Sequence, residues 1–252
     1  LVSAVALPIF FKKFIIEKQI LNKKGITDLI TLAIPFVIVA AGIMYYNYIR
    51  FGSVTDFGSS YNLTTNDVTR RGFDIGRTGL GLFTYLFQPP QFTATFPYIE
   101  AVSINTNYVG KTIYELCFGG LITTLPVLWF IFALPKVKEK LKESNLFAFV
   151  ITLLGIGFAL VIADTQAGGL LQRYYSDFGF IFFLAATIVI FAIFDKNDLK
   201  KSNINLRSFL FISTILSIVY TIALVFSVSD VTIDTQNPTL YAKILHLFEF
   251  WI

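Results

Sequence analysis

Apolar residues along this chain gather into five long stretches that contain no charged side chain. Each holds 17 to 22 residues, and the flanking charges are Asp28 and Arg50, Glu115 and Lys136, Glu143 and Asp164, Asp177 and Asp195, and Arg207 and Asp230. A helix rises about 1.5 Å per residue, so roughly 20 residues cross the ~30 Å hydrocarbon core of a bilayer. The pattern predicts an all-α polytopic helical membrane protein with about five full transmembrane helices, near residues 28–46, 117–135, 145–163, 178–194 and 208–229.

A water-soluble fold is excluded because the stretches lack a polar face. Soluble helices repeat polar residues at helical spacing, whereas residues 29–41 and 180–194 contain almost none. Composition agrees, with 55 % hydrophobic and 14 % charged residues and a mean hydropathy of +0.70. The net charge of +4 is too small to indicate a nucleic-acid partner, so membrane lipid is the partner that we expect.

The start of the chain looks like the tail of a further span. Residues 1–11 are apolar but too short to cross a bilayer, and no positively charged region precedes them as in a signal peptide. We therefore expect a partial span and the C-terminal part of a longer protein, with residues 1–252 forming a single transmembrane domain. The lone Cys117 excludes a disulfide within the chain and indicates a buried small side chain.

Lysine positions predict the orientation. Three short connections, 12–24, 136–142 and 196–207, hold 13 of the 20 basic residues. Short basic loops stay in the cytoplasm. We therefore predict an integral protein of a bacterial plasma membrane in which these three loops are cytoplasmic and residues 47–116, 164–177 and 229–252 are extracytoplasmic.

Two shorter apolar segments are predicted to lie at the outer surface. Residues 78–99 are uncharged, but Gln88-Pro89-Pro90-Gln91 interrupts them, so we expect a re-entrant or interfacial helix within the outer loop 47–116. Residues 237–252 begin with Asn237-Pro238, which is typical of a helix start, and predict an outer interfacial helix. Its Lys243, His246 and Glu249 form a polar stripe that we expect to face water.

Arginine is distributed differently from lysine. The predicted outer segments carry Arg50, Arg70, Arg71, Arg77 and Arg173, while the cytoplasmic loops use lysine almost alone. The planar guanidinium binds phosphate with two hydrogen bonds and tolerates a half-dry interface. The outer face is therefore suited to a lipid phosphate, although arginines that only anchor to headgroups are equally typical of membrane proteins.

Two local patterns place an arginine and a carboxylate at the outer boundary. The first, residues 45–61, leaves the membrane and contains Arg50 and Asp56; the second, residues 168–178, returns to it and contains Arg173 and Asp177. Both include glycines that let other groups approach the backbone closely. An aromatic belt with a local Arg–Asp pair is the simpler interpretation of each pattern.

The exit YNYIRFGSVTDFG, the re-entry QRYYSDF and the terminal NPTLYAKILHLFEFW resemble the C-terminal half of bacterial multi-span glycosyltransferases of the GT-C type. These are similar to the polyprenyl- or dolichyl-phosphate-mannose protein mannosyltransferases. The resemblance implies many transmembrane helices with long outer loops. It also implies sugar transfer from a polyprenyl-phosphate donor to an unknown acceptor on the outer membrane face.

In that family the catalytic carboxylate lies in the first outer loop, which falls upstream of Leu1, so no catalytic base is assigned to this sequence. Stabilisation of the departing phosphate is the chemistry that transfers to this chain. Its candidates are Arg173 and, after it, Arg50, Arg70, Arg71 and Arg77. Tyr174 and Tyr85 are candidates for contacts to the sugar, and Asp56 and Asp177 are candidate polar partners. No cofactor is evident, and a divalent metal at a diphosphate is compatible with the chemistry.

Two other functions remain open. One is a transporter or flippase for a lipid-linked substrate, because Pro35, Pro126, Gly155 and Gly157 interrupt spans as in broken helices. The uncharged spans argue against it. The other is a non-catalytic membrane subunit. The long arginine-bearing outer loop is the feature that favours a transferase over such a subunit.

Overall fold

The fold is that of a computed structural model, which describes residues 2–18, 22–58, 61, 72–194, 204–227 and 233–251. The chain divides into two compact units, Leu1–Gly72 and Phe73–Ile252, which we describe separately. The single transmembrane domain stays a prediction.

The first unit is built around one long helix. A short helix α1 (Val2–Phe10) continues into the π-helical segment η1 (Phe11–Ile16), and α2 (Lys23–Phe51) follows. The α2 helix ends at Gly52, whose φ of 71° suits glycine. Near the start of α2, the Lys13 ammonium binds the Asp28 carboxylate at 2.5 Å. With 29 residues, α2 is long and apolar enough to cross a membrane.

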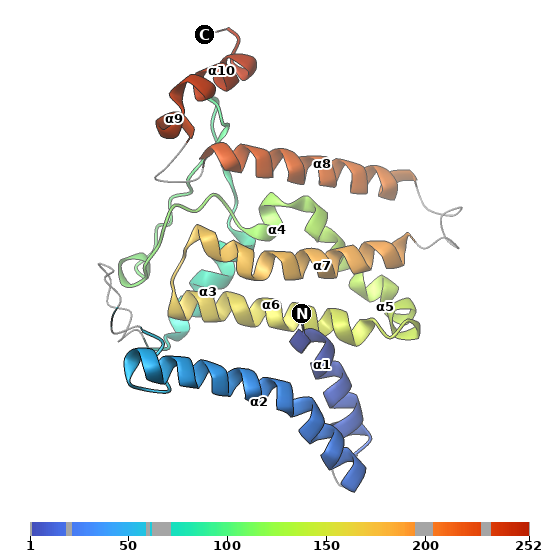
Figure 1. The fold of residues 1–252 in the computed structure, drawn as a ribbon. Helices are drawn as coiled ribbons and strands as arrows, with labels where there is room; N and C mark the ends of the chain where they lie inside the picture. Colours follow the sequence, from blue (N-terminus) through green and yellow to red (C-terminus); the bar gives the residue numbers. More distant parts are fainter. Residues whose placement is uncertain are drawn as a thin grey trace. The chain divides into compact units, whose positions relative to one another are not determined.

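The second unit contains three more helices long and apolar enough to span a bilayer, α6 (Phe147–Ala167), α7 (Tyr175–Ile193) and α8 (Ile204–Ser227). Figure 1 shows them running alongside one another in the second unit. Together with α2, the described part of the chain has four candidate spans. This confirms an all-α polytopic membrane protein, with α6, α7 and α8 near the predicted positions.

One of the five predicted spans, the second along the chain, is not confirmed. The prediction of a single helix near residues 117–135 is wrong. Residues 113–120, which we call the extended segment, form no helix, and only then follow α4 (Leu121–Thr124), the 3₁₀ segment η6 (Pro126–Ala133) and α5 (Leu134–Glu143). Gly119 has a φ of 130°, which an L side chain rarely adopts, and Pro126 removes a backbone donor where η6 begins. The segment is apolar enough for lipid, but it does not form one continuous helix.

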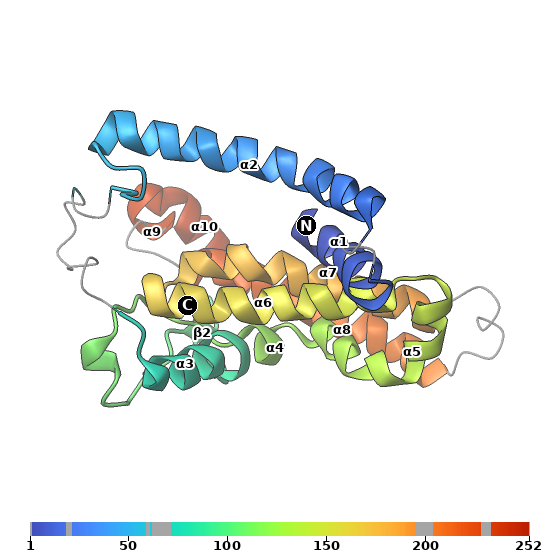
Figure 2. The same cartoon turned by 90° about the horizontal axis from the view of Figure 1, so that it is seen from below.

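The missing half is supplied by the segment before the two prolines. The α3 helix (Ile75–Leu82) and the π-helical segment η4 (Phe83–Phe87) end where α4 begins. The Gly120 N–H and the Thr123 hydroxyl both donate to the Gln88 carbonyl, at 2.7 and 2.6 Å. From one end of the second unit to the other, the order is α3, α4 and α5 (Figure 1 and Figure 2). The η4–α4 junction therefore joins two half-helices that lie far apart in the sequence.

The η4 segment is part of the main core. Buried side chains from η4, α4, η6, α6, α7 and two connections pack together: Tyr85, Leu86, Leu121, Leu125, Leu128, Val161, Leu170, Phe178, Phe182 and Ala186. Thr84, Tyr85 and Leu86 are buried, and the interfacial or re-entrant helix within the outer loop stays a prediction.

The remaining elements are a short hairpin, whose β2 strand contacts α8, and two C-terminal helices. A two-residue hairpin, β1 (Gln91–Phe92) and β2 (Ile99–Glu100), leads away from η4, and α9 (Ile233–Gln236) and α10 (Pro238–Phe248) end the described chain. The predicted start of α10 is confirmed, since Asn237 accepts a hydrogen bond from the Leu240 N–H. The prediction that Glu249 faces water is wrong. Its side chain is 4 % exposed and accepts a hydrogen bond from the Phe96 N–H, because the 93–98 turn packs on this helix.

Candidate functional site

The two ends of the second unit carry different charged residues. The α7 helix, about 28 Å long, separates them. At its C-terminal end the Lys140 ammonium of α5 donates to the Ala192 carbonyl at 3.3 Å. At its N-terminal end lie Asp177 in the first turn and Arg173 just before the helix. We call these the lysine end and the arginine end.

Arg173 presents its guanidinium at the surface of the arginine end. Its side chain is 68 % exposed, forms an ion pair with Glu115 at 3.6 Å and lies 5.5 Å from the centre of the Tyr174 ring. The Tyr174 ring packs against Gly168, so the aromatic side of the contact is fixed. An exposed pair of this kind contributes little to stability, so the guanidinium is available to a stronger anion.

At the same end of the unit, two buried acceptors have no hydrogen-bond partner among the described residues. They are Oδ2 of Asp164, near the end of α6, and Oε1 of Gln172, next to Arg173. The Asp164 carboxylate is also close enough to Asp177 for their charges to repel. Buried acceptors without a donor are rare, and they mark places where water or a ligand supplies the missing hydrogen bond.

The loop that carries these groups is held from two sides. On one side, Leu170 pairs with the extended segment. Its N–H donates to the Ile113 carbonyl and its carbonyl accepts from the Glu115 N–H, both at 2.8 Å. From the other side, the buried Tyr85 hydroxyl donates to Gly169 O at 2.8 Å and accepts from Leu171 N–H at 2.8 Å. These bonds bring Glu115 to Arg173 and fix the backbone on which Arg173 stands.

The start of α3 is joined to the same end of α6. Asp74 caps α3 by accepting from Gly76 N–H, and the Gln166 side chain bonds both the N–H and the carbonyl of Asp74, at 3.0 and 2.8 Å. Gly81 faces Thr165 so closely that an added Cβ would lie 2.0 Å from its hydroxyl. The half-helix is therefore seated against α6.

No family model, curated protein or solved structure matches this chain. The residues of the arginine end are thus the basis for assigning a function.

The predicted site residues separate into three groups. Arg173, Tyr174 and Asp177 lie together at the arginine end. Tyr85 and Arg77 belong to the same unit but face inward, which differs from the surface contacts expected of them. Tyr85 is 1 % exposed, and Arg77 is 6 % exposed with its guanidinium donating to Gln166 O at 3.3 Å. In this structure both side chains hold the scaffold together.

The other candidates lie in the first unit or outside the described residues. The Arg50 guanidinium bonds the Tyr46 hydroxyl and lies 5.2 Å from the Phe51 ring centre, while Asp56 accepts from Gly58 N–H at 2.7 Å. Each thus has local partners. Arg70, Arg71 and most of the predicted loop 196–207 lie outside the described residues.

Sequence reasoning missed Glu115, Asp164 and Gln172. Glu115 and Asp164 appeared there only as charges that bound apolar stretches. A carboxylate at a span boundary is common, so its position alone did not indicate a site. The parallel pairing of residue 114 with residue 170, which no local pattern announces, is what brings Glu115 to Arg173.

Proposed function

We propose that the chain takes part in glycosyl transfer from a polyprenyl-phosphate sugar, which binds at the arginine end. One observation carries the proposal: the end of the unit that exposes the Arg173 guanidinium also holds two buried acceptors, on Asp164 and Gln172, for which the described residues provide no donor. A phosphate needs the first kind of group, and sugar hydroxyls supply donors to the second.

The chemistry follows from these two kinds of group. An acceptor hydroxyl oxygen attacks the anomeric carbon, and the bond from that carbon to the phosphate oxygen breaks with its electron pair going to phosphate. The hydroxyl proton passes to a general base. Arg173, loosely held by Glu115, exchanges that partner for the phosphate, whose charge grows as the bond breaks. Open acceptors on Asp164 and Gln172 orient sugar hydroxyls.

The separation of charges suggests the sidedness. Four lysines of α5 lie at the lysine end, and short basic segments stay in the cytoplasm. In our proposal the arginine end faces the outer side of a bacterial plasma membrane. A polyprenyl-phosphate sugar would reach Arg173 from the outer leaflet, with its isoprenoid chain in lipid.

A transporter or flippase of a lipid-linked substrate is the second candidate, and the η4–α4 junction favours it. Interrupted helices with half-helix ends inside the bundle are typical of secondary transporters. Gly120 closes this junction tightly, since an added Cβ would lie 2.4 Å from the Leu86 carbonyl carbon. The junction is thus filled by protein, which favours the transferase.

The test uses the full chain in proteoliposomes with a photoactivatable polyprenyl-phosphate-mannose as the probe. Arg173→Ala removes the charged donor, and loss of a hydrogen bond to a charged group of about 2 kcal/mol corresponds to about thirtyfold weaker crosslinking. Lys111→Ala is the matched control, because Lys111 is a basic surface residue that precedes the same extended segment and contacts Tyr108.

Two results would overturn the proposal. Equal crosslinking of Arg173→Ala and the unchanged protein removes the arginine end as the donor site. Movement of the intact lipid across the bilayer without release of polyprenyl phosphate assigns the chain to the transporter class instead.

A further inference from the structure

The start of α2, in the first unit, contains a pocket that the candidate site does not use. There η1 and α2 enclose about 260 Å³, which we call the α2 pocket. Its lining is mostly polar: Lys13, Asn22, Lys24, Gly25 and Asp28. The Lys13–Asp28 ion pair joins the two walls, since Lys13 belongs to η1 and Asp28 to α2 (Figure 1). The volume is below the range of sites for whole drug-sized ligands, so it suits one small group of a larger molecule.

The α2 pocket has an excess of positive charge. Two ammonium groups, those of Lys13 and Lys24, line it together with a single carboxylate, that of Asp28. The Asp28 carboxylate is already held by Lys13 at 2.5 Å. Lys24 is near enough to attract Asp28, yet no described residue forms a hydrogen bond or an ion pair with its ammonium. An ammonium group carries three donors, so Lys24 offers them to an anion from outside the chain.

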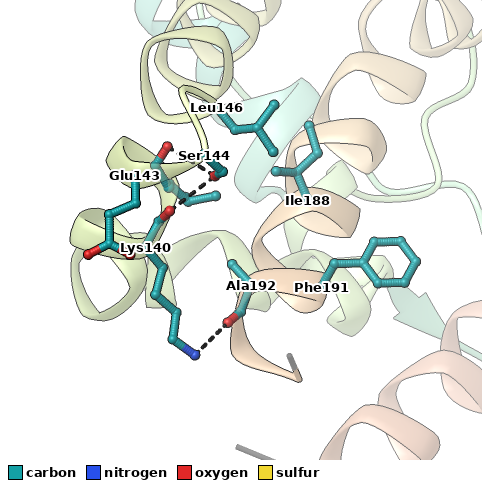
Figure 3. A pocket seen from close by; sticks show the side chains of 8 residues that line it. Lys140, Glu143, Ser144, Leu146, Ile188, Phe191 and Ala192 are labelled. Atoms are coloured by element: carbon teal, nitrogen blue, oxygen red, sulfur yellow. Dashed lines mark hydrogen bonds between the residues drawn. The ribbon is translucent and has the colours of Figure 1, made fainter. Parts of the chain in front are cut away.

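The larger pocket at the lysine end differs in this respect. The turn between α5 and α6 and the last turns of α7 enclose about 460 Å³ there, and the charged lining residues are one lysine, Lys140, and one glutamate, Glu143. These two charges balance, and Figure 3 shows the Lys140 ammonium donating to the Ala192 carbonyl, at 3.3 Å. The α2 pocket, which retains one positive charge, is therefore the stronger site for an anion.

The surroundings of the α2 pocket indicate which anion it binds. Residues 12–24 contain five lysines and one glutamate, and they adjoin a helix long and apolar enough to span a bilayer. Basic clusters in this position attract acidic lipids. Apolar side chains on the same two elements are exposed, including Ile16 of η1 at 65 % and Ile30 of α2 at 56 %. The phosphate and the acyl chains of one lipid thus both find partners on η1 and α2.

We propose that the α2 pocket binds the headgroup phosphate of one anionic phospholipid from the adjacent leaflet. The Lys24 ammonium donates to a phosphate oxygen, while Lys13 stays on Asp28 and contributes its charge. The acyl chains extend into the bilayer past the exposed apolar side chains of η1 and α2. A soluble phosphate has no counterpart for that apolar surface. The proposal rests on α2 as a membrane span and does not depend on glycosyl transfer.

Photocrosslinking in proteoliposomes of the full chain tests the α2 pocket. The probes are phosphatidylglycerol and phosphatidylcholine that carry the same diazirine at the start of one acyl chain. After digestion, crosslinks are counted on the fragment that contains residues 12–28. One lysine near the membrane surface favours an anionic lipid about fivefold, so phosphatidylglycerol should give about five times more crosslinks than phosphatidylcholine. Equal crosslinking by the two probes would overturn the proposal.

Matched variants separate the pocket from general surface charge. Lys24→Gln should remove the preference for phosphatidylglycerol, and Lys24→Arg should retain it. Lys23→Gln removes the same charge from the neighbouring exposed lysine, which does not line the pocket, and should leave the preference unchanged. Equal losses in Lys24→Gln and Lys23→Gln would assign the preference to surface charge and overturn the proposal. Competition by excess inorganic phosphate at constant ionic strength would also overturn it, because the ligand would then be a soluble phosphate.

Discussion

Tyr85 pins the η4 segment to the loop that carries Arg173, so its hydroxyl offers a sharp test of the structure. The change Tyr85→Phe removes one oxygen and retains the ring, which packs edge-on against Tyr175 and Phe178 with centroids 5.1 and 5.2 Å away. Apolar burial is therefore preserved. The hydrogen bonds to Gly169 O and from Leu171 N–H are both lost.

The expected loss of stability follows from what is left behind. A buried N–H without a partner costs about 1–3 kcal/mol, and loss of the donor to Gly169 adds about 1 kcal/mol, for a total of about 2–4 kcal/mol. Side-chain hydrogen bonds between membrane helices average only about 0.6 kcal/mol because alternative partners exist. The larger figure applies here because Leu171 lies outside a regular helix and has no helical acceptor to fall back on.

Cys117 provides the assay. It is the single cysteine of the chain, is 5 % exposed and lies 3.4 Å from the Tyr175 hydroxyl. Its reaction with a maleimide therefore reports opening of the core, and a 2 kcal/mol loss of stability raises the labelling rate about thirtyfold. Tyr114→Phe, on a side chain that is 52 % exposed, is the control and should change the rate little. If Tyr85→Phe labels as slowly as the control, the proposed pin is wrong.

Two further predictions concern the junction and the sidedness. Gly120→Ala should destabilise the protein by about 1–3 kcal/mol in thermal unfolding, because its Cβ would overlap the backbone of residues 86–88. Gly110→Ala is the control and should be neutral, because the space around Gly110 is open. Equal melting temperatures of the two variants would contradict the tight junction. Of the variants Asn107→Cys and Glu139→Cys, only position 107 should react with an impermeant maleimide in intact cells, and labelling of position 139 alone would reverse the proposed orientation.

Sequence alone predicted the parts of the fold that hydropathy determines. The α6, α7 and α8 helices each cover most of a charge-free stretch, and Asn237-Pro238 marks the start of α10. In each case the controlling interaction is local or is made with lipid. Transfer of apolar side chains from water depends on composition, and a helix cap depends on neighbours in the chain.

The parts that were wrong depend on contacts between distant residues. Hydropathy reports that residues 117–135 suit lipid, but it does not report whether their backbone is one helix. The interruption depends on the backbone of Gly119 and on the hydrogen bond from the Gly120 N–H to the Gln88 carbonyl. Tyr85 was a candidate for contacts to a sugar and Glu249 belonged to a predicted polar stripe, yet both are buried by segments more than eighty residues away in sequence.

The candidate site was predictable only in part. Arg173, Tyr174 and Asp177 are neighbours in the sequence, so one motif contains them. Glu115 and Asp164 join them only when the extended segment pairs with the 168–171 loop and α6 ends beside α7. No periodicity within either segment reports that arrangement.

The composite of η4 and α4 has a consequence for how the protein is made. Neither half offers the translocation machinery a continuous hydrophobic helix of full length, and some thirty residues separate the end of one from the start of the other. Stable residence of both halves in lipid therefore has to wait for α6 and α7, which are synthesised later and supply their packing partners. Ribosomes that stall before residue 147 would leave both halves without those partners, and quality-control proteases would meet them as unassembled segments.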